Sequence, residues 1–351
     1  MPVVAISVDQ LWRPQPGGIA TYVRGLLRGL EQLESSWRAI ALAPRGDGDH
    51  ELSVPIRRAP LGVRPLTQLW SRWPLGVGAG VDATHATSLA GPFRGASRNA
   101  VALHDLLWRD EPTASTPAGI RFHEDRLRRV LARDDLRLVI TSPPLVERLR
   151  AEGVNEERLY SVKMGVDDDV EPASSREVRA LLAQYGVTGP YVLYAGTREP
   201  RKNLARLVSA HAAARTRAPD LGPLVLVGPA GWGDESLGSS IVLGTRSRSM
   251  MKGLVRDAGV FAYVPLREGW GLPAVEALAL GTRVVVSATT PSAWGNDEVV
   301  AVNPLEEESI TQGLVHTLER GDDEGARAKR RESVAGLTWR ACAHDHLAAW
   351  S

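Results

Sequence analysis

The sequence has little cysteine and no long apolar run, and each absence excludes a class of protein. Of its 351 residues only Cys342 is a cysteine, which excludes a disulfide framework and a metal site built from several thiolates. No stretch reaches about 18 uninterrupted apolar residues, so no membrane-spanning helix is expected. The start, MPVVAISVDQ, lacks the basic and the long apolar segments of a signal peptide and predicts a first strand. We therefore expect a protein of the reducing cytoplasm.

An excess of charge of one sign is also missing. The chain has 42 Lys and Arg against 41 Asp and Glu, a formal net charge of +1. Without a basic excess, nucleic acid is not an expected partner. Lysine itself is scarce, which genomic composition can explain, and this makes any lysine in a loop worth attention. The lysines are Lys163, Lys202, Lys252 and Lys329.

Short apolar runs alternate with segments of helical periodicity along the chain. Continuous apolar runs between polar turns predict strands that are buried on both faces. We expect strands at 3–7, 38–43, 100–105, 136–142, 191–196, 223–228, 259–264 and 282–288, about four in each half. The alternation predicts parallel sheets in a doubly wound α/β architecture, with two similar domains facing each other.

Two polar stretches mark the domain boundaries. The first spans 167–190 and contains three aspartates, two serines and a proline at its start. The second lies near 336, and a final helix is expected to begin at Thr338, which would act as its N-cap. The predicted domains are 1–170, with the helix 338–351 packing back on it, and 185–336.

The second half opens with a basic loop, in YVLYAGTREPRKNLARLV. A strand is expected to end at Gly196, and the loop then carries Arg198, Arg201 and Lys202 before Asn203 caps a helix. A helix N-terminus attracts anions through its free N–H groups and its dipole. Three cations beside such an end predict a diphosphate site. The alternative is a solvated basic loop without a ligand.

A second motif, EGWGLPAVEALALG, follows the strand predicted at 259–264. Gly269 and Gly271 would let backbone amides approach a ligand closely, and a helix beginning near Pro273 would add its positive end. Glu276 either stabilises that helix end or accepts ribose hydroxyls, as acidic residues do in dinucleotide sites. Glu268 precedes the turn and would face a sugar hydroxyl.

These motifs resemble the retaining glycosyltransferases of family 4, which have the GT-B fold. The signature of that family is a Glu, seven residues and a second Glu around a Gly-aromatic-Gly-Leu-Pro turn, and Glu268 to Glu276 matches it residue by residue. Further stretches resemble the phosphate loop, the Gly-Gly turn, the histidine loop and the interdomain link of the family: GTREPRKN (196–203), GGIATYVRGLL (17–27), LHDLLW (103–108) and MGVDDDV (164–170). The resemblance covers nearly the whole chain. It implies two facing Rossmann-like domains with parallel sheets and an interdomain cleft.

The resemblance also implies a role for each matching residue on the donor side. Glu268 would bind hydroxyls of the donor sugar, and Glu276 would bind the ribose. Arg198 and Lys202 would hold the diphosphate, while Arg201 is the weaker candidate and could face outward. The turn residues beside the two glutamates would line the donor site: Gly269, Trp270, Gly271 and Leu272.

On the acceptor side, the resemblance points to the first Gly-Gly turn and to one histidine. Gly17 and Gly18 would approach the phosphate or the acceptor through their backbone. His104 would lie beside the sugar, acting through its side chain or its backbone, although a histidine at a strand end is often only a structural group. His85, in VDATHATS, has the same two interpretations, lining the cleft or serving the core.

The function implied is a hexosyltransferase of bacterial glycan biosynthesis. The motifs are most similar to those of mannosyl- and rhamnosyltransferases, which favours transfer of mannose from GDP-mannose to a saccharide or to a lipid-linked glycan. Members of the family are retaining and have no clear protein nucleophile, so the departing diphosphate would act as the base. No metal site is expected, because the Asp run 167–169 lies in the linker and His344, Asp345 and His346 do not share a helix face. The co-substrate is therefore the only small molecule expected.

Other functions fit less well. A GT-B sugar-nucleotide epimerase would need a carboxylate and a histidine set for proton abstraction, and no such cluster is seen. A non-catalytic sugar-nucleotide-binding protein would be favoured if Glu268 or Lys202 were missing. A dehydrogenase is disfavoured because no Gly-x-Gly-x-x-Gly follows the first strand.

A basic stretch in the first half raises the question of membrane contact. Residues 52–81 contain no acid, and the segment 56–73 combines four arginines with Trp70 and Trp73. Residues 121–137 add six arginines against four acids. Basic residues beside tryptophan suit an anionic bilayer, which would place the protein peripherally at the inner membrane face. The alternative is a solvated charged face.

Overall fold

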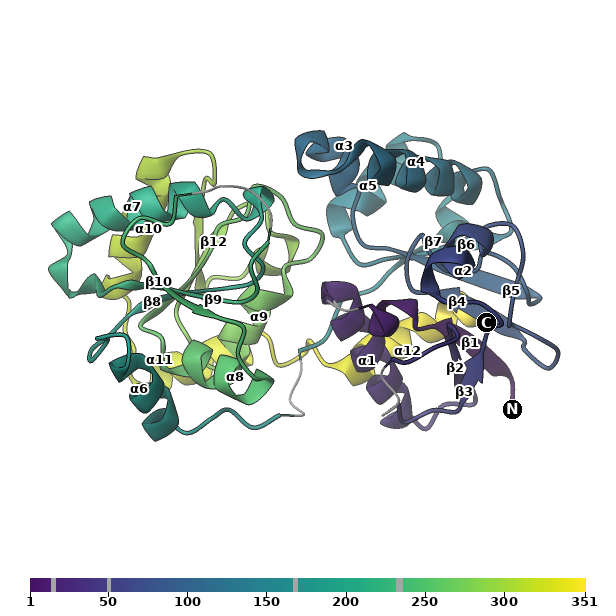
Figure 1. Cartoon of the computed structure of the whole chain (residues 1–351), viewed down its shortest axis with the longest axis horizontal. Coiled ribbons are helices and arrows are strands. Elements are labelled where there is room, and N and C mark those ends of the chain that lie inside the picture. The colour runs from purple at the N-terminus through teal and green to yellow at the C-terminus, as the bar shows by residue number, and fades with distance from the viewer. Residues whose placement is uncertain (14–16, 49–51, 167–169, 232–235) are drawn as a thin grey trace. The chain divides into compact units, whose positions relative to one another are not determined.

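The computed structural model describes residues 1–13, 17–48, 52–166, 170–231 and 236–351. The chain divides into two compact units, one made of Met1–Gly165 with Leu337–Ser351 and the other of Val166–Gly336. Each unit is built on one parallel β-sheet with helices on both of its faces (Figure 1). The Asp run 167–169 considered above lies outside the described residues.

The first unit contains a seven-stranded sheet in the order β3-β2-β1-β4-β5-β6-β7, with every pair parallel. Its strands are β1 (Val3–Ser7), β2 (Arg38–Ala43), β3 (Ile56–Arg58), β4 (Ala83–Ala86), β5 (Arg98–Leu103), β6 (Leu136–Ile140) and β7 (Leu159–Ser161). The central strands are buried along almost their whole length, because helices cover both faces of the sheet. This is the arrangement that the apolar runs predict.

The helices of the first unit include the last helix of the chain. They are α1 (Gly18–Glu31), α2 (Val63–Leu69), α3 (Leu107–Asp110), α4 (Pro117–Leu131), α5 (Pro143–Ala151) and α12 (Trp339–Trp350). As predicted, Thr338 caps α12, since its hydroxyl accepts a hydrogen bond from the backbone N–H of Ala341 at 3.1 Å.

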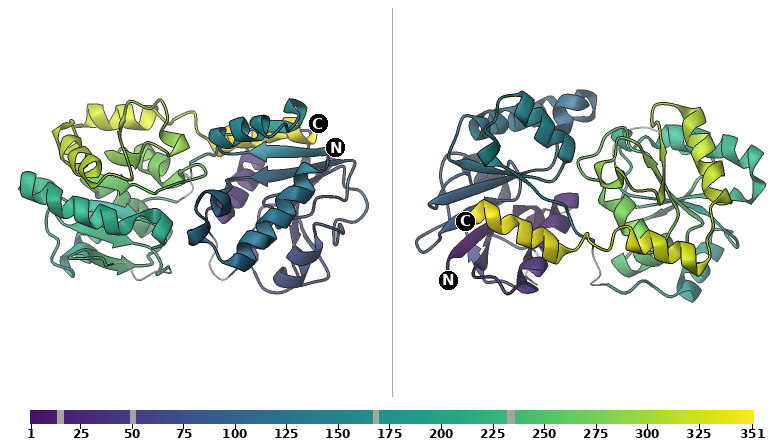
Figure 2. Two further views of the ribbon diagram at one scale, coloured as in Figure 1. Left: turned by 90° about the horizontal axis from the view of Figure 1, so that it is seen from above. Right: turned by 180° about the vertical axis from the view of Figure 1, so that it is seen from behind.

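The last helix packs on α1 because α1 presents two glycines to it. A Cβ added to Gly25 would lie 2.1 Å from the Trp339 ring, and one added to Gly29 would lie 2.0 Å from the Trp339 carbonyl oxygen. Both glycines therefore provide space that α12 fills. Figure 2 shows the yellow C-terminal helix lying along the purple and blue elements of this unit.

The second unit contains a six-stranded parallel sheet in the order β10-β9-β8-β11-β12-β13. Its strands are β8 (Val192–Ala195), β9 (Leu224–Val227), β10 (Ile241–Gly244), β11 (Val260–Tyr263), β12 (Val284–Ser287) and β13 (Val299–Val302). All eight strands expected from the sequence are present in the two sheets. The expected count of about four clear strands in each half is too low. β3, β4 and β7 are too short or too polar to stand out as apolar runs, whereas β10 and β13 are short apolar runs that were not predicted as strands.

Helices flank the second sheet in two layers. They are α6 (Ser175–Ala183), α7 (Leu204–Arg217), α8 (Arg248–Asp257), α9 (Leu272–Ala279), α10 (Glu307–Glu319) and α11 (Glu324–Glu332). α7 packs against α10, and α6 packs against α8 (Figure 1). A capping box between Ser174 and Glu177 starts α6, within the polar stretch that was predicted to separate the domains.

Both sheets have a point where the strand order reverses. In the first unit it lies between β1 and β4, and in the second between β8 and β11. Ligands of open parallel sheets bind outside the carboxyl ends of the strands at such a point. The loops after these four strands are therefore where functional residues are expected, and they contain the two motifs and the Gly-Gly turn.

Candidate functional site

Lys202 and Glu268 meet at the switch point of the second sheet. Lys202 follows β8 in a short 3-10 turn (Pro200–Lys202), and Glu268 follows β11. The Lys202 ammonium donates hydrogen bonds to Oε1 of Glu268 at 2.6 Å and to the Tyr263 hydroxyl at 2.8 Å. The side chains of the pair are 10% and 13% exposed. The structure thus brings together two predicted site residues in a nearly buried ion pair.

Arg201 joins this pair. Its guanidinium donates to the same Oε1 of Glu268 at 2.6 Å and to Glu199 at 2.9 Å. The sequence left open that Arg201 faces outward, but its side chain is only a quarter exposed and faces Glu268. A hydrogen bond of 2.9 Å from the Leu266 N–H to the Arg201 carbonyl also holds the two loops together.

The charges of this cluster are set by burial and by one another. Burial tends to raise the pKa of the Glu268 carboxyl, but Lys202 and Arg201 outweigh it, so the pKa lies below its ordinary value. Burial lowers the pKa of Lys202, and Glu268 does not fully offset this because Arg201 repels the ammonium. The Glu268 carboxylate is paired with two cations, whereas the Lys202 ammonium shares this carboxylate with Arg201. Glu268 is therefore firmly ionised.

Asn203 fixes the end of the basic loop, but in a different way from the one predicted. It lies at the N-cap position of α7, yet its side chain makes no capping bond to the helix. Instead, its amide donates to the carbonyls of Val264 at 3.0 Å and Pro304 at 2.7 Å. With φ at +62°, Asn203 adopts a left-handed conformation that asparagine tolerates better than most residues. The side chain holds the loop against β11 instead of closing the helix end.

The second motif forms a tight turn into α9. Gly271 has φ of +98° at the N-cap, and a Cβ there would lie 2.3 Å from a methyl carbon of Thr290. The turn is tied to the following loop by Ser292, which donates its backbone N–H to the Trp270 carbonyl and its hydroxyl to the Gly271 carbonyl, both at 3.0 Å. Trp270 is 5% exposed and packs in the core, as does Leu272. Of the four turn residues predicted to line the site, these two side chains belong to the core.

Glu276 lies in the second turn of α9 and is half-buried. No acidic residue occupies the first turn of this helix. Because the effect of the helix dipole falls off within the first turn, stabilisation of the helix end is a weak explanation for this carboxylate. Arg198 lies between Gly196 and the cluster and is half-buried, and its guanidinium has no partner among the residues that the structure describes.

The Gly-Gly turn of the first unit leaves backbone exposed. Gly17 is the N-cap of α1 and Gly18 its first residue, and both are exposed. A Cβ at either position would meet nothing within 4 Å. These glycines are therefore not required for packing, which is consistent with a close approach of a ligand to their backbone.

His104 follows β5, as expected, but both of its ring nitrogens have protein partners. Nε2 lies 2.9 Å from the Thr87 carbonyl oxygen, and Nδ1 lies 3.0 Å from the Thr141 hydroxyl. Since a carbonyl only accepts, Nε2 carries the proton and Nδ1 accepts from the threonine. Burial lowers the pKa of His104, so the ring is neutral. A contact with a ligand would have to use the backbone or the exposed edge of the ring.

His85 belongs to a buried hydrogen-bonded chain in the core of the first unit. Its Nε2 lies 2.8 Å from the Tyr22 hydroxyl, which also lies 2.6 Å from Nε2 of His346 on α12. His346 uses its Nδ1 proton on the Cys342 carbonyl at 2.7 Å, so its Nε2 accepts from Tyr22 and His85 donates to Tyr22. His85 is fully buried, and the core interpretation is therefore the correct one.

Sequence reasoning missed the residues that orient the predicted ones. Tyr263 supplies a hydroxyl to Lys202, the Thr141 hydroxyl donates to Nδ1 of His104, and Tyr22 links two histidines. Each lies at a strand end or on a helix face, where the sequence pattern predicts burial but gives no partner. Only the position of Tyr263, last in the strand before the second motif, could have suggested its role.

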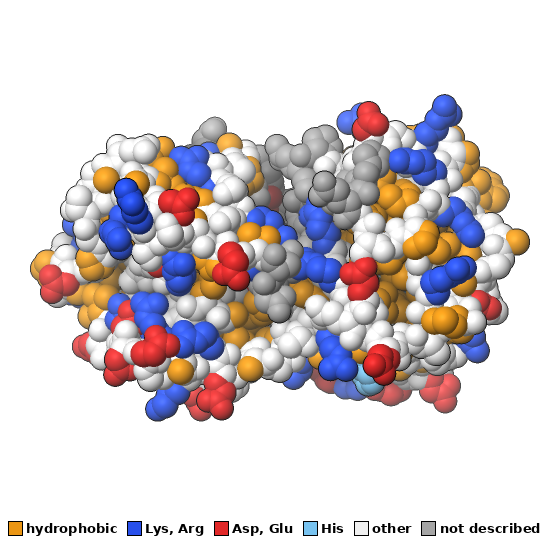
Figure 3. Space-filling model, turned by 90° about the horizontal axis from the view of Figure 1, so that it is seen from below, with side chains coloured by type: hydrophobic (Ala, Val, Ile, Leu, Met, Phe, Trp, Pro, Cys, Tyr) orange, Lys and Arg blue, Asp and Glu red, His pale blue; other side chains and the backbone are white. Residues whose placement is uncertain are grey.

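The basic stretch of the first unit is only partly a surface. Trp70 is fully buried and donates its indole N–H to the Leu75 carbonyl at 2.9 Å, whereas Trp73 is 50% exposed. Arg57 donates to the Val77 carbonyl, while Arg64 and Arg72 are exposed. On the view of Figure 3, basic and acidic side chains alternate over both units. In the described ranges no helix combines the length and the apolar character needed to cross a bilayer.

The sequence predicts no metal site. Among the residues described, no three His, Cys, Asp or Glu side chains are arranged to hold an ion.

Comparison with known proteins gives this geometry a context. Residues 189–320 match the family model of the glycosyl transferases group 1. The chain is 28% identical over 269 residues to O-antigen chain mannosyltransferase B of Escherichia coli, across 72% of this chain and 70% of that protein. It is 29% identical over 233 residues to an MMP alpha-(1->4)-mannosyltransferase of Mycolicibacterium hassiacum, across 61% of this chain and only 53%, about half, of that protein.

Solved structures match the whole chain in fold. A sucrose-phosphate synthase of Thermosynechococcus elongatus superposes with a TM-score of 0.73 at 22% identity, across 98% of this chain and 96% of that one. The Anabaena protein HepE, solved in complex with UDP-glucose, superposes with a TM-score of 0.69 at 17% identity, across 99% and 98%. The two parallel sheets are thus those of the GT-B fold.

Proposed function

We propose that this chain, which has the GT-B fold, is a member of the group 1 glycosyl transferases and a retaining hexosyltransferase that moves mannose from GDP-mannose to a saccharide or a lipid-linked glycan. The observation that carries this proposal is the buried cluster of Lys202, Arg201 and Glu268 at the switch point of the second sheet. Cations beside an ionised carboxylate suit a ligand that has a diphosphate and a sugar.

The diphosphate would be held by cations that retain unused donors. A lysine ammonium has three donors, and Lys202 spends two of them on Glu268 and Tyr263. The third is left for a phosphate oxygen. The Arg198 guanidinium, which makes no hydrogen bond or ion pair with a described residue, can offer a bidentate pair of N–H groups. The backbone amides of the turn at Gly271 and the start of α9 add a positive end.

The sugar and the ribose would be bound by the two glutamates. Both cations of the cluster bind Oε1 of Glu268, so neither of them uses Oε2, which can accept a hydroxyl of the donor sugar. Glu276, half-buried on α9, would accept the ribose hydroxyls. The ion pairs keep Glu268 charged and oriented before the donor arrives, which is the preorganisation that a polar site needs.

The chemistry asked of these residues is stabilisation of a leaving group. As the bond between the sugar and the diphosphate breaks, negative charge grows on the phosphate oxygens, and Lys202 and Arg198 would lie ready to meet it. The acceptor hydroxyl would attack from the side on which the diphosphate leaves, and the diphosphate would take its proton. This route requires no protein nucleophile, and the product keeps the anomeric configuration of the donor.

Mannose and GDP are proposed from the relatives and from the motifs. Both curated relatives named above are mannosyltransferases, one of an O-antigen chain. HepE was solved with UDP-glucose, so a UDP-sugar is the competing donor. We place the reaction in the cytoplasm, with the exposed Arg64, Arg72 and Trp73 touching an anionic membrane face.

The first experiment is a thermal-shift series with GDP, UDP, ADP, dTDP and their sugars, each with magnesium and with EDTA. A ligand that binds only the folded protein raises the midpoint as its concentration rises. We expect GDP and GDP-mannose to raise it in EDTA, and Lys202→Ala and Glu276→Ala to lose the shift. Lys329→Ala, a change at an exposed lysine of the same unit, should keep it. A larger shift with UDP than with GDP would make a UDP-sugar the donor in place of GDP-mannose. No shift with any nucleotide at millimolar concentration would favour a non-catalytic protein.

A second experiment tests the stereochemistry and the metal requirement. Transfer from the confirmed donor to water or to a mannoside is followed by NMR at the anomeric proton of the first product. Retention of the donor configuration, at the same rate in EDTA, is expected. An inverted product, or activity restored only by a divalent ion, would contradict this part of the proposal.

A further inference from the structure

The second unit has a pocket that the proposed reaction does not use. It has a volume of about 590 Å³ and lies beside the amino ends of β8, β11 and β12, where Tyr191, Gly259 and Arg283 line it. The Lys202–Glu268 cluster lies at the carboxyl ends of β8 and β11, which is the opposite edge of the same sheet. The volume is within the range of about 300–1,000 Å³ that is usual for small-molecule sites.

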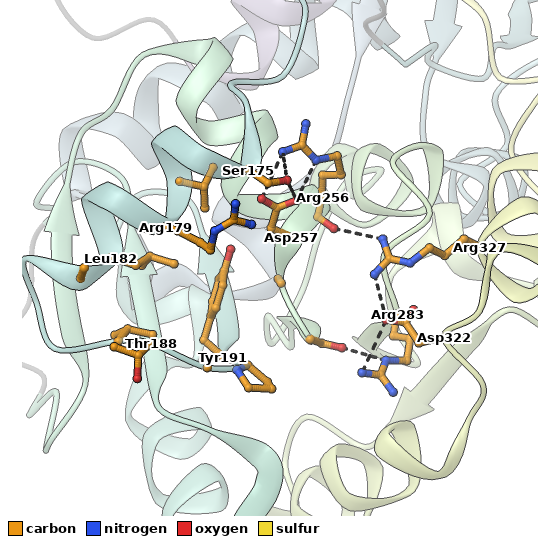
Figure 4. A pocket seen from close by; sticks show the side chains of 17 residues that line it. Ser175, Arg179, Leu182, Thr188, Tyr191, Arg256, Asp257, Arg283, Asp322 and Arg327 are labelled. Carbon is orange, nitrogen blue, oxygen red and sulfur yellow. Dashed lines mark hydrogen bonds and ion pairs between the residues drawn. The ribbon is translucent and has the colours of Figure 1, made fainter.

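The pocket has two unlike walls. One is apolar and comes from α6 and the segment before β8, where Val178, Leu182 and Tyr191 lie. The other is charged and contains Arg283, at the start of β12, and Arg327, on α11. Figure 4 shows Leu182 and Tyr191 across the pocket from Arg283, Arg327 and Asp322. A molecule that fills it would need an apolar part and an anionic part.

The charged wall has more cations than anions. Arg327 lies 2.8 Å from Asp322, Arg330 lies 2.6 Å from it and Arg283 lies 3.9 Å from it, so three guanidiniums share one carboxylate. Arg330 is 2% exposed and serves the fold, but Arg327 and Arg283 line the pocket. Burial lowers the pKa of Arg283, Asp322 opposes this, and Arg327 lowers it further. The positive charge is therefore only partly balanced within the protein.

The arginines on the side of α6 add to this excess. Arg256 is bound to Asp257 through two of its nitrogens, at 2.7 and 3.1 Å, and is thereby neutralised. Arg179 lines the pocket from α6, is exposed, and makes no hydrogen bond or ion pair with another described residue. The lining thus contains four arginines and two aspartates, and Arg179 is the cation that no carboxylate of the described chain engages.

We infer that this pocket is a second ligand site, which binds a small phosphorylated molecule with its phosphate toward Arg179, Arg283 and Arg327 and its ring or chain against Val178, Leu182 and Tyr191. Guanidinium groups bind phosphate oxygens with paired N–H donors. Arg179, which has no hydrogen bond or ion pair with another described residue, can supply such a pair. Arg283, whose Nε donates to the Gly259 carbonyl at 2.8 Å, and Arg327, whose two terminal nitrogens donate to the Arg256 carbonyl at 3.3 Å and to Asp322 at 2.8 Å, can add only single N–H groups from the other side. The site is separate from the donor site, and its occupancy does not depend on the identity of the transferred sugar.

Isothermal titration with phenyl phosphate and inorganic phosphate tests this inference. The titrations use the full chain carrying Lys202→Ala, which removes the main cation of the donor site, after circular dichroism has shown that this chain is folded. Phenyl phosphate is expected to bind about tenfold more tightly than inorganic phosphate, since its ring would cover part of the apolar wall. Binding should weaken as the salt concentration rises from about 50 to about 500 mM, because salt screens the attraction between the phosphate and the arginines.

Variants then locate the site. Arg179→Gln and Arg327→Gln should each weaken phenyl phosphate binding by about tenfold, the usual magnitude for one charge-assisted bond. Arg176→Gln is the matched control, because Arg176 is exposed on the same helix and does not line the pocket. If the three variants bind alike, the ligand lies elsewhere and the inference is wrong. If phenyl phosphate gives no binding heat at concentrations up to about 10 mM, its dissociation constant is weaker than that of a specific site, and the inference is wrong.

Discussion

The ammonium of Lys202 lies 2.6 Å from Oε1 of Glu268, although 66 positions separate the two residues in the chain. The parallel topology explains this proximity, since β8 and β11 are neighbours and their carboxyl ends lie at one edge. Tyr263 and Arg201 complete the surroundings of the pair. The residues proposed to bind a sugar and a diphosphate are therefore held in place by one another before any ligand binds.

Replacing Lys202 tests how much of the reaction depends on this arrangement. Lys202→Met keeps the apolar stem and removes the charge, and we expect kcat to fall about 10²- to 10³-fold, as when one preorganised donor is lost. Breaking a buried ion pair usually costs about 3–5 kcal/mol of stability, but Arg201 remains on Glu268, so a smaller loss is expected. Steady-state kinetics and urea unfolding measure the two effects.

Lys329→Met, on the exposed face of α11, serves as the control for a lysine removed without effect on the site. A Lys202→Met enzyme whose kcat and KM stay within threefold of the wild type would remove Lys202 from the proposed diphosphate site, threefold being the usual scatter of a neutral change.

Gly18→Ala separates a role in ligand binding from a role in folding. Gly18 begins α1, and a Cβ there meets nothing within 4 Å, so alanine should leave stability unchanged or raise it by up to about 1 kcal/mol. If a ligand approaches its backbone closely, the added methyl group should lower kcat/KM by tenfold or more, a loss of about 1.4 kcal/mol. Differential scanning fluorimetry measures the effect on stability, and steady-state kinetics measures the effect on kcat/KM.

A matched control is Gly325→Ala, a glycine in the first turn of α11 with only an ordinary contact at 3.4 Å. It should stabilise that helix in the same way and leave the kinetics unchanged. Unaltered kinetics in Gly18→Ala as well would mean that the Gly-Gly turn does not contact either substrate.

Protonation of His346 should make the first unit sensitive to acid. Burial, opposed by the bond to Cys342, lowers the pKa of His346 to about 4 from an ordinary value of 6.5. The unfolded chain therefore binds a proton between these two values that the folded chain does not, and stability falls as the pH drops from about 6.5 to about 4. From the two pKa values, the loss at pH 4.5 is on the order of 2–3 kcal/mol.

His346→Gln should flatten this pH dependence, because glutamine can still accept from Tyr22 but cannot be protonated. His85 and His104, whose pKa values are also lowered by burial, will keep part of the slope. The free energy of unfolding at pH 7 and pH 4.5 is measured for this variant, for the wild type and for His316→Gln, in which an exposed histidine is replaced. Equal slopes in all three proteins would mean that His346 is protonated in the folded state.

The sequence predicted which residues meet at the switch point of the second sheet better than it predicted how they are held. Lys202 could be predicted because it is a scarce lysine in a basic loop after a strand. Glu268 could be predicted because it forms a regularly spaced pair with Glu276 around a glycine-rich turn. The side chain of Asn203 could not be placed, because its partners at Val264 and Pro304 depend on which strands are neighbours. β4 was missed for a related reason, since the run Ala-Thr-His-Ala shows no apolar pattern and is buried only through the sheet around it.

The histidines show that the sequence can place a residue correctly without predicting whether its side chain is available to a ligand. His104 was predicted at a strand end, and it lies there, but its ring nitrogens are taken up by Thr87 and Thr141 from two other strand ends. Whether a polar side chain is free to meet a ligand depends on such long-range partners. A pattern read along the chain identifies the kind of residue, while the fold decides whether its atoms are available.

Gly271→Ala tests whether the turn between the two glutamates is required in its observed form. Alanine there must adopt φ near +98°, a strain of about 1–3 kcal/mol, and its Cβ would lie 2.3 Å from a methyl carbon of Thr290, so the turn or the Thr290 loop must also move. Gly244→Ala, in the same unit, is the control. Gly244 has φ of +71° and nothing lies within 4 Å of its Cβ position, so alanine there adds the backbone strain without a steric clash. We expect Gly271→Ala to be the less stable of the two by urea unfolding, and to lose donor-induced stabilisation because Glu268 and Glu276 flank the turn. If the two variants lose the same stability and both keep the donor shift, the close packing of Gly271 on Thr290 does not position the site.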